Sequence, residues 1–157
     1  ILIPTGLVIA AAGMGLLANN LDITATYAGS ILPPLLIVGA GLGIVFSAAM
    51  NTATFGAAHS DAGVASAMVN TVQQIGGAIG TALLSTIAAN ALSDYISHHG
   101  TSAVAQAHAA ITSYTAAFWV AAAIFLGAAL ASSFVLRSGV LTAPSDDSGE
   151  EAPAVAV

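Results

Sequence analysis

Long apolar runs separated by single charged residues make up most of this chain. Four charged residues precede the C-terminal tail: Asp22, Asp61, Asp94 and Arg137. They divide it into uncharged segments, residues 1–21, 23–60, 62–93 and 95–136. A helix needs about 20 apolar residues to cross roughly 30 Å of hydrocarbon, and each segment can supply that length. The pattern therefore predicts four membrane-spanning helices, at about residues 3–18, 31–55, 62–92 and 113–136.

The expected fold class is all-α, a polytopic membrane protein. Backbone N–H and C=O groups in lipid must be satisfied within closed elements, and the chain lacks the alternating pattern of barrel strands. Pro33 and Pro34 suit the first turn of the second helix, where a backbone N–H is not needed. We expect short turns at residues 19–30 and 56–61 and a longer loop at residues 92–112.

Composition supports the membrane assignment. Of the 157 residues, 57% are hydrophobic and 5% are charged, and the mean hydropathy is +0.94. A typical soluble domain carries about 25% charged residues, because its surface must be polar. The membrane bundle is expected to take residues 1–141. The acidic, proline-containing residues 142–157 are expected to form a disordered tail.

The charges also suggest an orientation. Arg137 is the one Lys or Arg of the chain and follows the fourth span directly, so the positive-inside tendency places the C-terminus in the cytoplasm. The connections that contain Asp22 and Asp94 would then face outside. A net charge of −6 argues against nucleic acid as a partner, and the absence of cysteine excludes disulfides and thiolate metal sites.

Polar and small side chains gather in two of the four predicted helices. The first and fourth contain mainly Ala, Leu, Ile, Val, Phe and Gly, whereas the second and third carry stripes at helical spacing. The stripe of the second helix consists of Gly39, Gly43, Ser47, Asn51 and Thr54. The stripe of the third consists of Ser66, Asn70, Gln73, Gln74, Gly77, Thr81 and Ser85. This asymmetry predicts an inner pair and an outer pair of helices.

Two interpretations of the stripes remain open. Small residues four positions apart let helices approach closely, and amides can join helices at about 0.6–2 kcal/mol each. We expect this packing role for Gly39, Gly43, Gly76, Gly77 and Gly80. Polar groups can instead line a water-filled pathway, where uncharged donors and acceptors hold a substrate. The candidate pathway residues are Asn51, Ser66, Asn70, Gln73 and Gln74.

The predicted helices do not carry the residues of an enzyme site. Serine and histidine do not converge with a carboxylate at a usable spacing, and no phosphate loop is present. His98, His99 and His108 have side chains that bind metals, but adjacent histidines cannot easily point at one ion, and Asp94 is the one acid nearby. We therefore expect no catalytic residue, no metal and no cofactor, and place these histidines at the surface of a loop.

The stretch DAGVASAMVNTVQQIGGAIGTALLSTIAANA, residues 61–91, resembles the fourteen-helix drug:proton antiporters of the major facilitator superfamily, especially actinobacterial members. In that family the segment before and within the penultimate helix reads roughly G-x-A-S-x-x-x-N-T-x-(R/Q)-Q-x-G-G-x-x-G. The matching residues are Gly63, Ala65, Ser66, Asn70, Thr71, Gln73, Gln74, Gly76, Gly77 and Gly80. The layout of residues 27–63 is also similar, although Ser47 and Ala48 stand where the family often has a proline. The resemblance covers about residues 1–137.

The resemblance implies the last four helices of a multidrug efflux transporter that works by alternating access and is driven by a proton gradient. The second and third helices would line the central cavity, and the first and last would pack outside. In that family the coupling carboxylate usually lies in the N-terminal half, and no acid lies inside a predicted span of this chain. The implied partners are the remaining N-terminal helices, the lipid bilayer, protons and a small amphipathic or cationic drug-like substrate, at the plasma (inner) membrane.

Other functions are compatible with four apolar helices. The chain opens on ILIPTG without an initiating Met, and we expect it to be the C-terminal part of a longer protein. A complete four-helix transporter like the small multidrug resistance family would act as a dimer, but that family needs a Glu in its first helix and residues 3–18 contain none. A non-transporting membrane subunit would use its glycine stripes for helix association alone.

Overall fold

Four long helices and one short π-helical turn make up the described part of the chain. The computed structural model describes residues 2–54 and 62–135, and the structural statements below concern these residues. The elements are α1 (Leu2–Asn20), η1 (Tyr27–Ile31), α2 (Leu32–Thr54), α3 (Ala62–His99) and α4 (Ala103–Val135). Each long helix contains a stretch long and apolar enough to cross a membrane, which confirms the all-α class with four spans. The predicted turn at residues 56–61, Arg137 and the predicted tail lie outside the described ranges.

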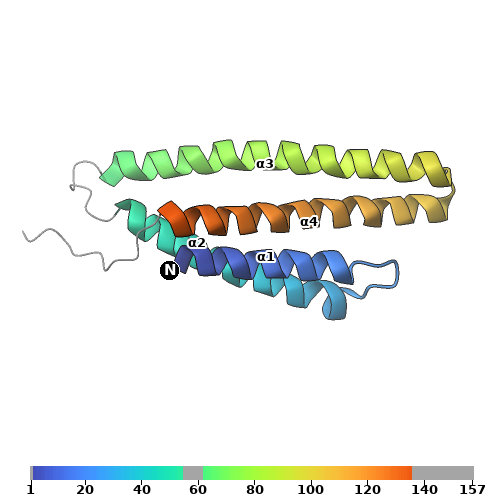
Figure 1. Ribbon diagram of the computed structural model, residues 1–157, viewed down its shortest axis with the longest axis horizontal. Helices are drawn as coiled ribbons and strands as arrows, with labels where there is room; N and C mark the ends of the chain where they lie inside the picture. Colours follow the sequence, from blue (N-terminus) through green and yellow to red (C-terminus); the bar gives the residue numbers. More distant parts are fainter. Residues whose placement is uncertain (1, 55–61, 136–157) are drawn as a thin grey trace, which may run out of the picture.

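The long helices lie side by side in alternating directions (Figure 1). α1 packs along both α2 and α4, and α4 packs along α3, whereas α2 and α3 touch over a much shorter stretch. In the most apolar part of α1, 33% of the residues are buried, against 0% in α3. The predicted outer pair, α1 and α4, therefore forms the centre of the described bundle, and the polar helices flank it. Which pair is inner in a complete protein stays a prediction.

Glycine brings the backbones of α1 and α2 together. A Cβ atom added at Gly41 would lie 2.6 Å from both the backbone nitrogen of Ala10 and the carbonyl oxygen of Gly6. One added at Gly13 would lie 2.8 Å from the backbone nitrogen of Val38. These separations are shorter than real Cβ contacts, so any larger residue would push the two helices apart. The close contact between α1 and α2 thus depends on the absence of side chains at these glycines.

The turn between α1 and α2 is built around Asp22. Its carboxylate accepts the backbone N–H of Ile23 at 2.7 Å and the hydroxyl of Thr24 at 3.3 Å, and its carbonyl accepts the N–H of Ala25 at 3.0 Å. The π-helical turn η1 follows, in which the N–H of Leu32 donates to the carbonyl of Tyr27. Helix α2 then opens with its two prolines in the first turn, as the sequence predicted.

The predicted loop at residues 92–112 is wrong. Helix α3 continues to His99 and α4 begins at Ala103, so three residues connect them. Gly100 ends α3 with a φ of 80°, and its N–H donates to the carbonyl of Ile96 at 2.9 Å. Ser102 caps α4, because its hydroxyl accepts the N–H of Ala105 at 3.2 Å. The polar residues predicted a loop because a membrane span ends where the apolar residues end, but a helix can continue past the membrane into water.

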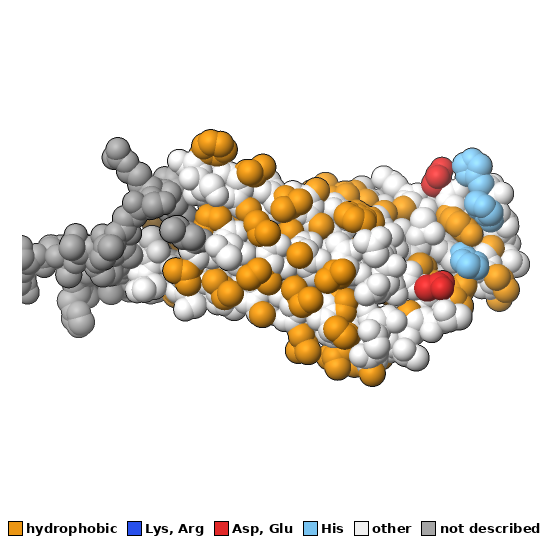
Figure 2. Space-filling view, turned by 60° about the horizontal axis from the view of Figure 1, so that its bottom comes forward, with side chains coloured by type: hydrophobic (Ala, Val, Ile, Leu, Met, Phe, Trp, Pro, Cys, Tyr) orange, Lys and Arg blue, Asp and Glu red, His pale blue; other side chains and the backbone are white. Residues whose placement is uncertain are grey.

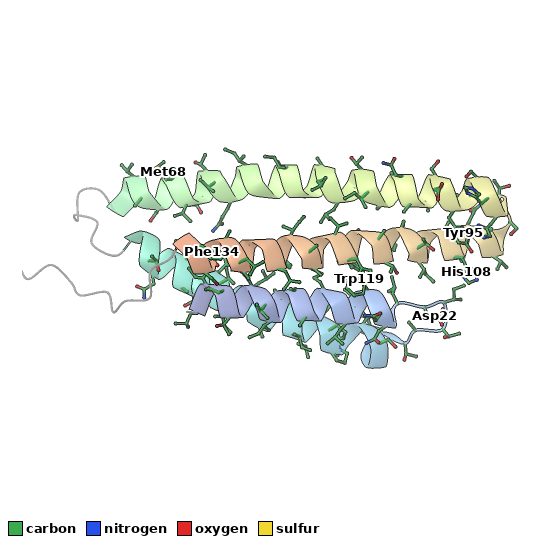
Figure 3. All side chains as sticks on the ribbon, in the orientation of Figure 1. Asp22, Met68, Tyr95, His108, Trp119 and Phe134 are labelled. Atoms are coloured by element: carbon green, nitrogen blue, oxygen red, sulfur yellow. The ribbon has the colours of Figure 1, made fainter. Side chains whose placement is uncertain are left out.

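The α3–α4 hairpin consequently extends beyond α1. With 38 residues α3 is about 57 Å long, whereas α1 with 19 residues is about 28 Å long, at the usual rise per residue. Trp119 lies beside the last turns of α1, near Gly15, while Tyr95 and His108 lie farther out along the hairpin (Figure 3). The hairpin end therefore projects past the region that α1 can span.

Candidate substrate pathway

The polar stripe of α3 lies mainly on exposed surface. Asn70, Gln73 and Gln74 are exposed, and Ser66 is half-buried. These residues belong to the half of α3 that begins at Ala62, where nearly every side chain is exposed. In the other half, half-buried positions such as Leu84, Ala88 and Ala91 recur every three or four residues. Packing against neighbouring helices is therefore concentrated in the half of α3 that carries no amide cluster.

Asn51 lies in a groove beside α2. The groove has a volume of about 560 Å³ and combines the start of α1 with the polar stripe of α2. Its lining residues are Leu2, Ala40, Gly43, Ile44, Ser47, Ala48, Asn51 and Thr52. The structure thus brings together three members of the stripe predicted for α2. It does not bring Asn51 into the same groove as any of the α3 amides.

A second groove separates α2 from α3 near the start of α3. It has a volume of about 400 Å³ and is lined by Val45, Phe46 and Ala49 of α2 and by Met68, Val69, Val72 and Gln73 of α3. Gln73 is the one polar residue in this lining. Among the predicted pathway residues of α3, it is the one that lines a groove shared with α2.

On α2 and α3, the threonine hydroxyls and the amides of the predicted pathway differ in how they are satisfied. Thr52, Thr71 and Thr86 each donate to the carbonyl four residues earlier, at 2.8–2.9 Å, so their polar groups are used within their own helix. Within residues 2–54 and 62–135, the amides of Asn51, Asn70, Gln73 and Gln74 make no hydrogen bond. An amide without a partner is unfavourable in apolar surroundings, by about 1–3 kcal/mol on mutational evidence. These four amides need partners such as water, a substrate or further helices.

The glycines of the predicted packing stripes face open space. A Cβ added at Gly39, Gly43, Gly76, Gly77 or Gly80 would meet no atom within 4 Å among the described residues. Their packing role can therefore concern only contacts beyond these residues, and it stays a prediction. The contacts that the sequence analysis missed are made by Gly6, Gly13 and Gly41. Gly6 and Gly13 are seven residues apart, which places them on one helix face, and that spacing was an available signal.

The described aspartates and histidines gather at the end of the bundle that lies away from the amide-bearing half of α3. Figure 2 shows the described aspartates and histidines at the end formed by the α3–α4 hairpin and the turn after α1. Nδ1 of His98 lies 3.8 Å from the Asp94 carboxylate, and Tyr95 stacks on His99 with ring centroids 4.1 Å apart. In the described residues, no three potential ligands are placed to hold a metal ion. The histidines lie on the last turn of α3 and on α4 rather than in a loop.

Two curated proteins are similar in sequence to this chain. The puromycin resistance protein pur8 of Streptomyces alboniger is 37% identical over 154 residues, which are 98% of this chain and 31% of that protein. The cephamycin export protein CmcT of Amycolatopsis lactamdurans is 38% identical over 78 residues, 47% of this chain and 16% of that protein. The chain thus spans about a third of the length of the first relative. No family model and no solved structure matches it.

Proposed function

We propose that this chain is the C-terminal part of a multidrug efflux transporter of the major facilitator superfamily. Similarity to a drug-resistance protein over 98% of the chain is the observation that carries the proposal. The name of a second relative, an export protein, supports outward transport. Four apolar helices in alternating directions support a multi-pass location, which we propose to be the plasma (inner) membrane.

The unpaired amides support a pathway on α2 and α3. The plain helices α1 and α4 pack against each other, whereas Asn51, Asn70 and Gln74 are exposed and lack partners among the described residues. Further helices of the same protein would enclose a water-containing cavity against these faces, in which the amides bind substrate. Alternating access around such a midplane cavity is the mechanism that this arrangement supports best.

We propose that a proton gradient drives export, with the coupling carboxylate outside this chain. The described acids, Asp22 and Asp94, lie at the hairpin end of the molecule and not in the amide-bearing half (Figure 2). A proton-coupled cycle needs an intramembrane group that titrates, and the described parts of α2 and α3 contain no such group near the amides. The C-terminus would face the cytoplasm, as the sequence position of Arg137 suggests.

Transport by everted membrane vesicles tests this function. Vesicles that contain the full-length protein should take up puromycin when a proton gradient is imposed, because everted vesicles accumulate what the cell exports. A protonophore should abolish the uptake, and vesicles without the protein provide the control. Uptake that persists with the protonophore would contradict proton coupling. If the vesicles transport neither puromycin nor a cephamycin, the result would contradict the efflux function.

A further inference from the structure

The end of the α3–α4 hairpin differs in composition from the helices behind it. Residues 93–112, the hairpin tip, contain one Asp, three His, one Gln and five Ser or Thr. Residues 116–131 of α4 contain only apolar side chains and glycine, apart from the indole N–H of Trp119, over about 24 Å of helix. α1 is about 28 Å long, and its last turns lie beside Trp119 (Figure 3). Because the hydrocarbon core of a bilayer is about 30 Å thick, both helices place its edge near the base of the tip.

The charged side chains of the tip are exposed. The side chains of Asp94 and His98 are 80% and 68% exposed, and the described aspartates and histidines lie at this end of the bundle (Figure 2). A charged side chain at the centre of a span costs about 2.5–3.5 kcal/mol. Water hydrates these groups without that cost, so they favour a position outside the hydrocarbon.

The tip has the contacts of a folded helical hairpin rather than those of a loop. Ala105 and Ala109, one turn apart on α4, are buried. Tyr95 of α3 stacks on His99 with ring centroids 4.1 Å apart, and its centroid lies 6.4 Å from that of His108 on α4. Both helices continue from apolar spans, so they extend into the tip without a new nucleation step, which is the costly part of helix formation.

Amphipathic rings lie on two faces of α4 at the base of the tip. Tyr114 and Trp119 are 57% and 50% exposed among the described residues. They are five residues apart, which separates them by about 7.5 Å along the helix and by about 140° around it. Rings of this kind settle at the headgroup level of a bilayer. A single covering helix would meet one face of α4, whereas a headgroup layer surrounds the helix, so rings on two faces match the lipid.

We propose that the hairpin tip is a folded helical projection that stands in water outside the bilayer, and that Tyr114 and Trp119 anchor its base among phospholipid headgroups. The hydroxyl of Tyr114 and the indole N–H of Trp119 donate to headgroup oxygens while their rings contact the acyl chains. This proposal rests on the multi-pass membrane location and not on drug export.

Spin-label accessibility tests the position of the tip. Val104→Cys and Leu126→Cys are labelled with a nitroxide in the full-length, otherwise cysteine-free protein in phospholipid vesicles. They form a matched pair, because both are exposed apolar residues on nearly the same face of α4, about 40° apart. Oxygen concentrates in hydrocarbon and a polar nickel chelate stays in water, so the ratio of chelate to oxygen accessibility should be at least about three-fold higher at Val104→Cys.

An equal or lower ratio at Val104→Cys would overturn the projection, as would protection of this position from both reagents. Gln106→Cys, also exposed in the tip, repeats the measurement if Val104→Cys fails to fold. Leu130→Cys is the second reference within the apolar stretch of α4.

Fluorescence quenching tests the anchor. Trp119 is kept as the single tryptophan of the full-length protein, in vesicles of lipids brominated either near the headgroup or near the end of the acyl chain. Bromine near the headgroup should quench Trp119 at least about two-fold more strongly than deep bromine, because the ring lies at headgroup level. Ile124→Trp in a Trp119→Phe background lies within the apolar stretch and should show the opposite order.

Equal or stronger quenching of Trp119 by deep bromine would overturn the anchor, as would quenching by neither lipid. Both measurements are independent of transport, so a protein that exports no drug still decides this proposal.

Discussion

Gly41 and Gly43 are two residues apart on α2 and lie in opposite surroundings. A Cβ at Gly41 would press on the backbone of α1, whereas a Cβ at Gly43 would meet nothing within 4 Å. The sequence predicted a packing role for Gly43 from its spacing to Gly39, but it predicted no such role for Gly41. Spacing identifies which small residues share a face, but it does not say which face meets a neighbouring helix. That depends on the three-dimensional placement of α1.

Gly41→Ala should destabilise the protein and Gly43→Ala should not. The added methyl group at Gly41 overpacks the α1–α2 contact, which typically costs about 1–3 kcal/mol. At Gly43 the same change gains up to about 1 kcal/mol from helix propensity, if no further helix covers it. Thermal unfolding of the purified full-length variants in one detergent compares the two. Equal stability of both variants would contradict the close α1–α2 approach.

At the scale of the helices, the sequence correctly predicted four long α-helices. It predicted the third and fourth helices too short. Four apolar runs were enough to predict four helices, because lipid leaves the backbone few alternatives. The stretch around His98 and His99 is polar, and low apolar content predicts a loop there. Its local signals, Gly100 after the last turn and Ser102 before an alanine-rich run, identify a tight helix–helix connection instead.

Gly100→Ala should destabilise the α3–α4 hairpin. A φ of 80° is accessible to glycine, whereas a residue with a Cβ pays about 1–2 kcal/mol there. Gly127→Ala, within α4 at a position where a Cβ meets nothing within 4 Å among the described residues, is the matched control and should be neutral or slightly stabilising. Hydrogen exchange of the hairpin amides should rise in the first variant alone. Unchanged exchange would show that another residue sets this connection.

Gly77→Leu should abolish transport without preventing membrane insertion. Among the described residues, a Cβ at Gly77 would meet nothing within 4 Å, so leucine fits the four helices themselves. In a complete transporter we expect that space to receive another helix, where overpacking typically costs roughly 1–3 kcal/mol. Vesicle transport and membrane-fraction yield measure the two effects separately. Transport at the wild-type level would mean that this face is open to lipid or to a wide cavity.

For the whole molecule, the described residues divide into two ends of different chemistry. The hairpin end carries the aspartates and histidines, and the amide-bearing half of α3 lies toward the other end (Figure 3). The sequence predicted the amide cluster by residue type and spacing, and the structure adds that the amides lack partners. The sequence could not predict the α2–α3 groove, because the groove depends on α2 packing along α1 and α3 packing along α4, which leaves only a short contact between α2 and α3.

Cysteine accessibility in the full-length transporter tests the central claim that α3 lines a water-filled pathway. In a cysteine-free background, Asn70→Cys, Gln74→Cys and Gly77→Cys should react with a membrane-impermeant thiol reagent supplied from one side, because thiolates form in water and are suppressed in apolar surroundings. Ile75→Cys and Ile79→Cys, on other faces of the helix, should stay unreactive, and substrate should slow labelling of the reactive set. If all five positions resist labelling from both sides of the membrane, the amides are buried between helices and the pathway assignment is wrong.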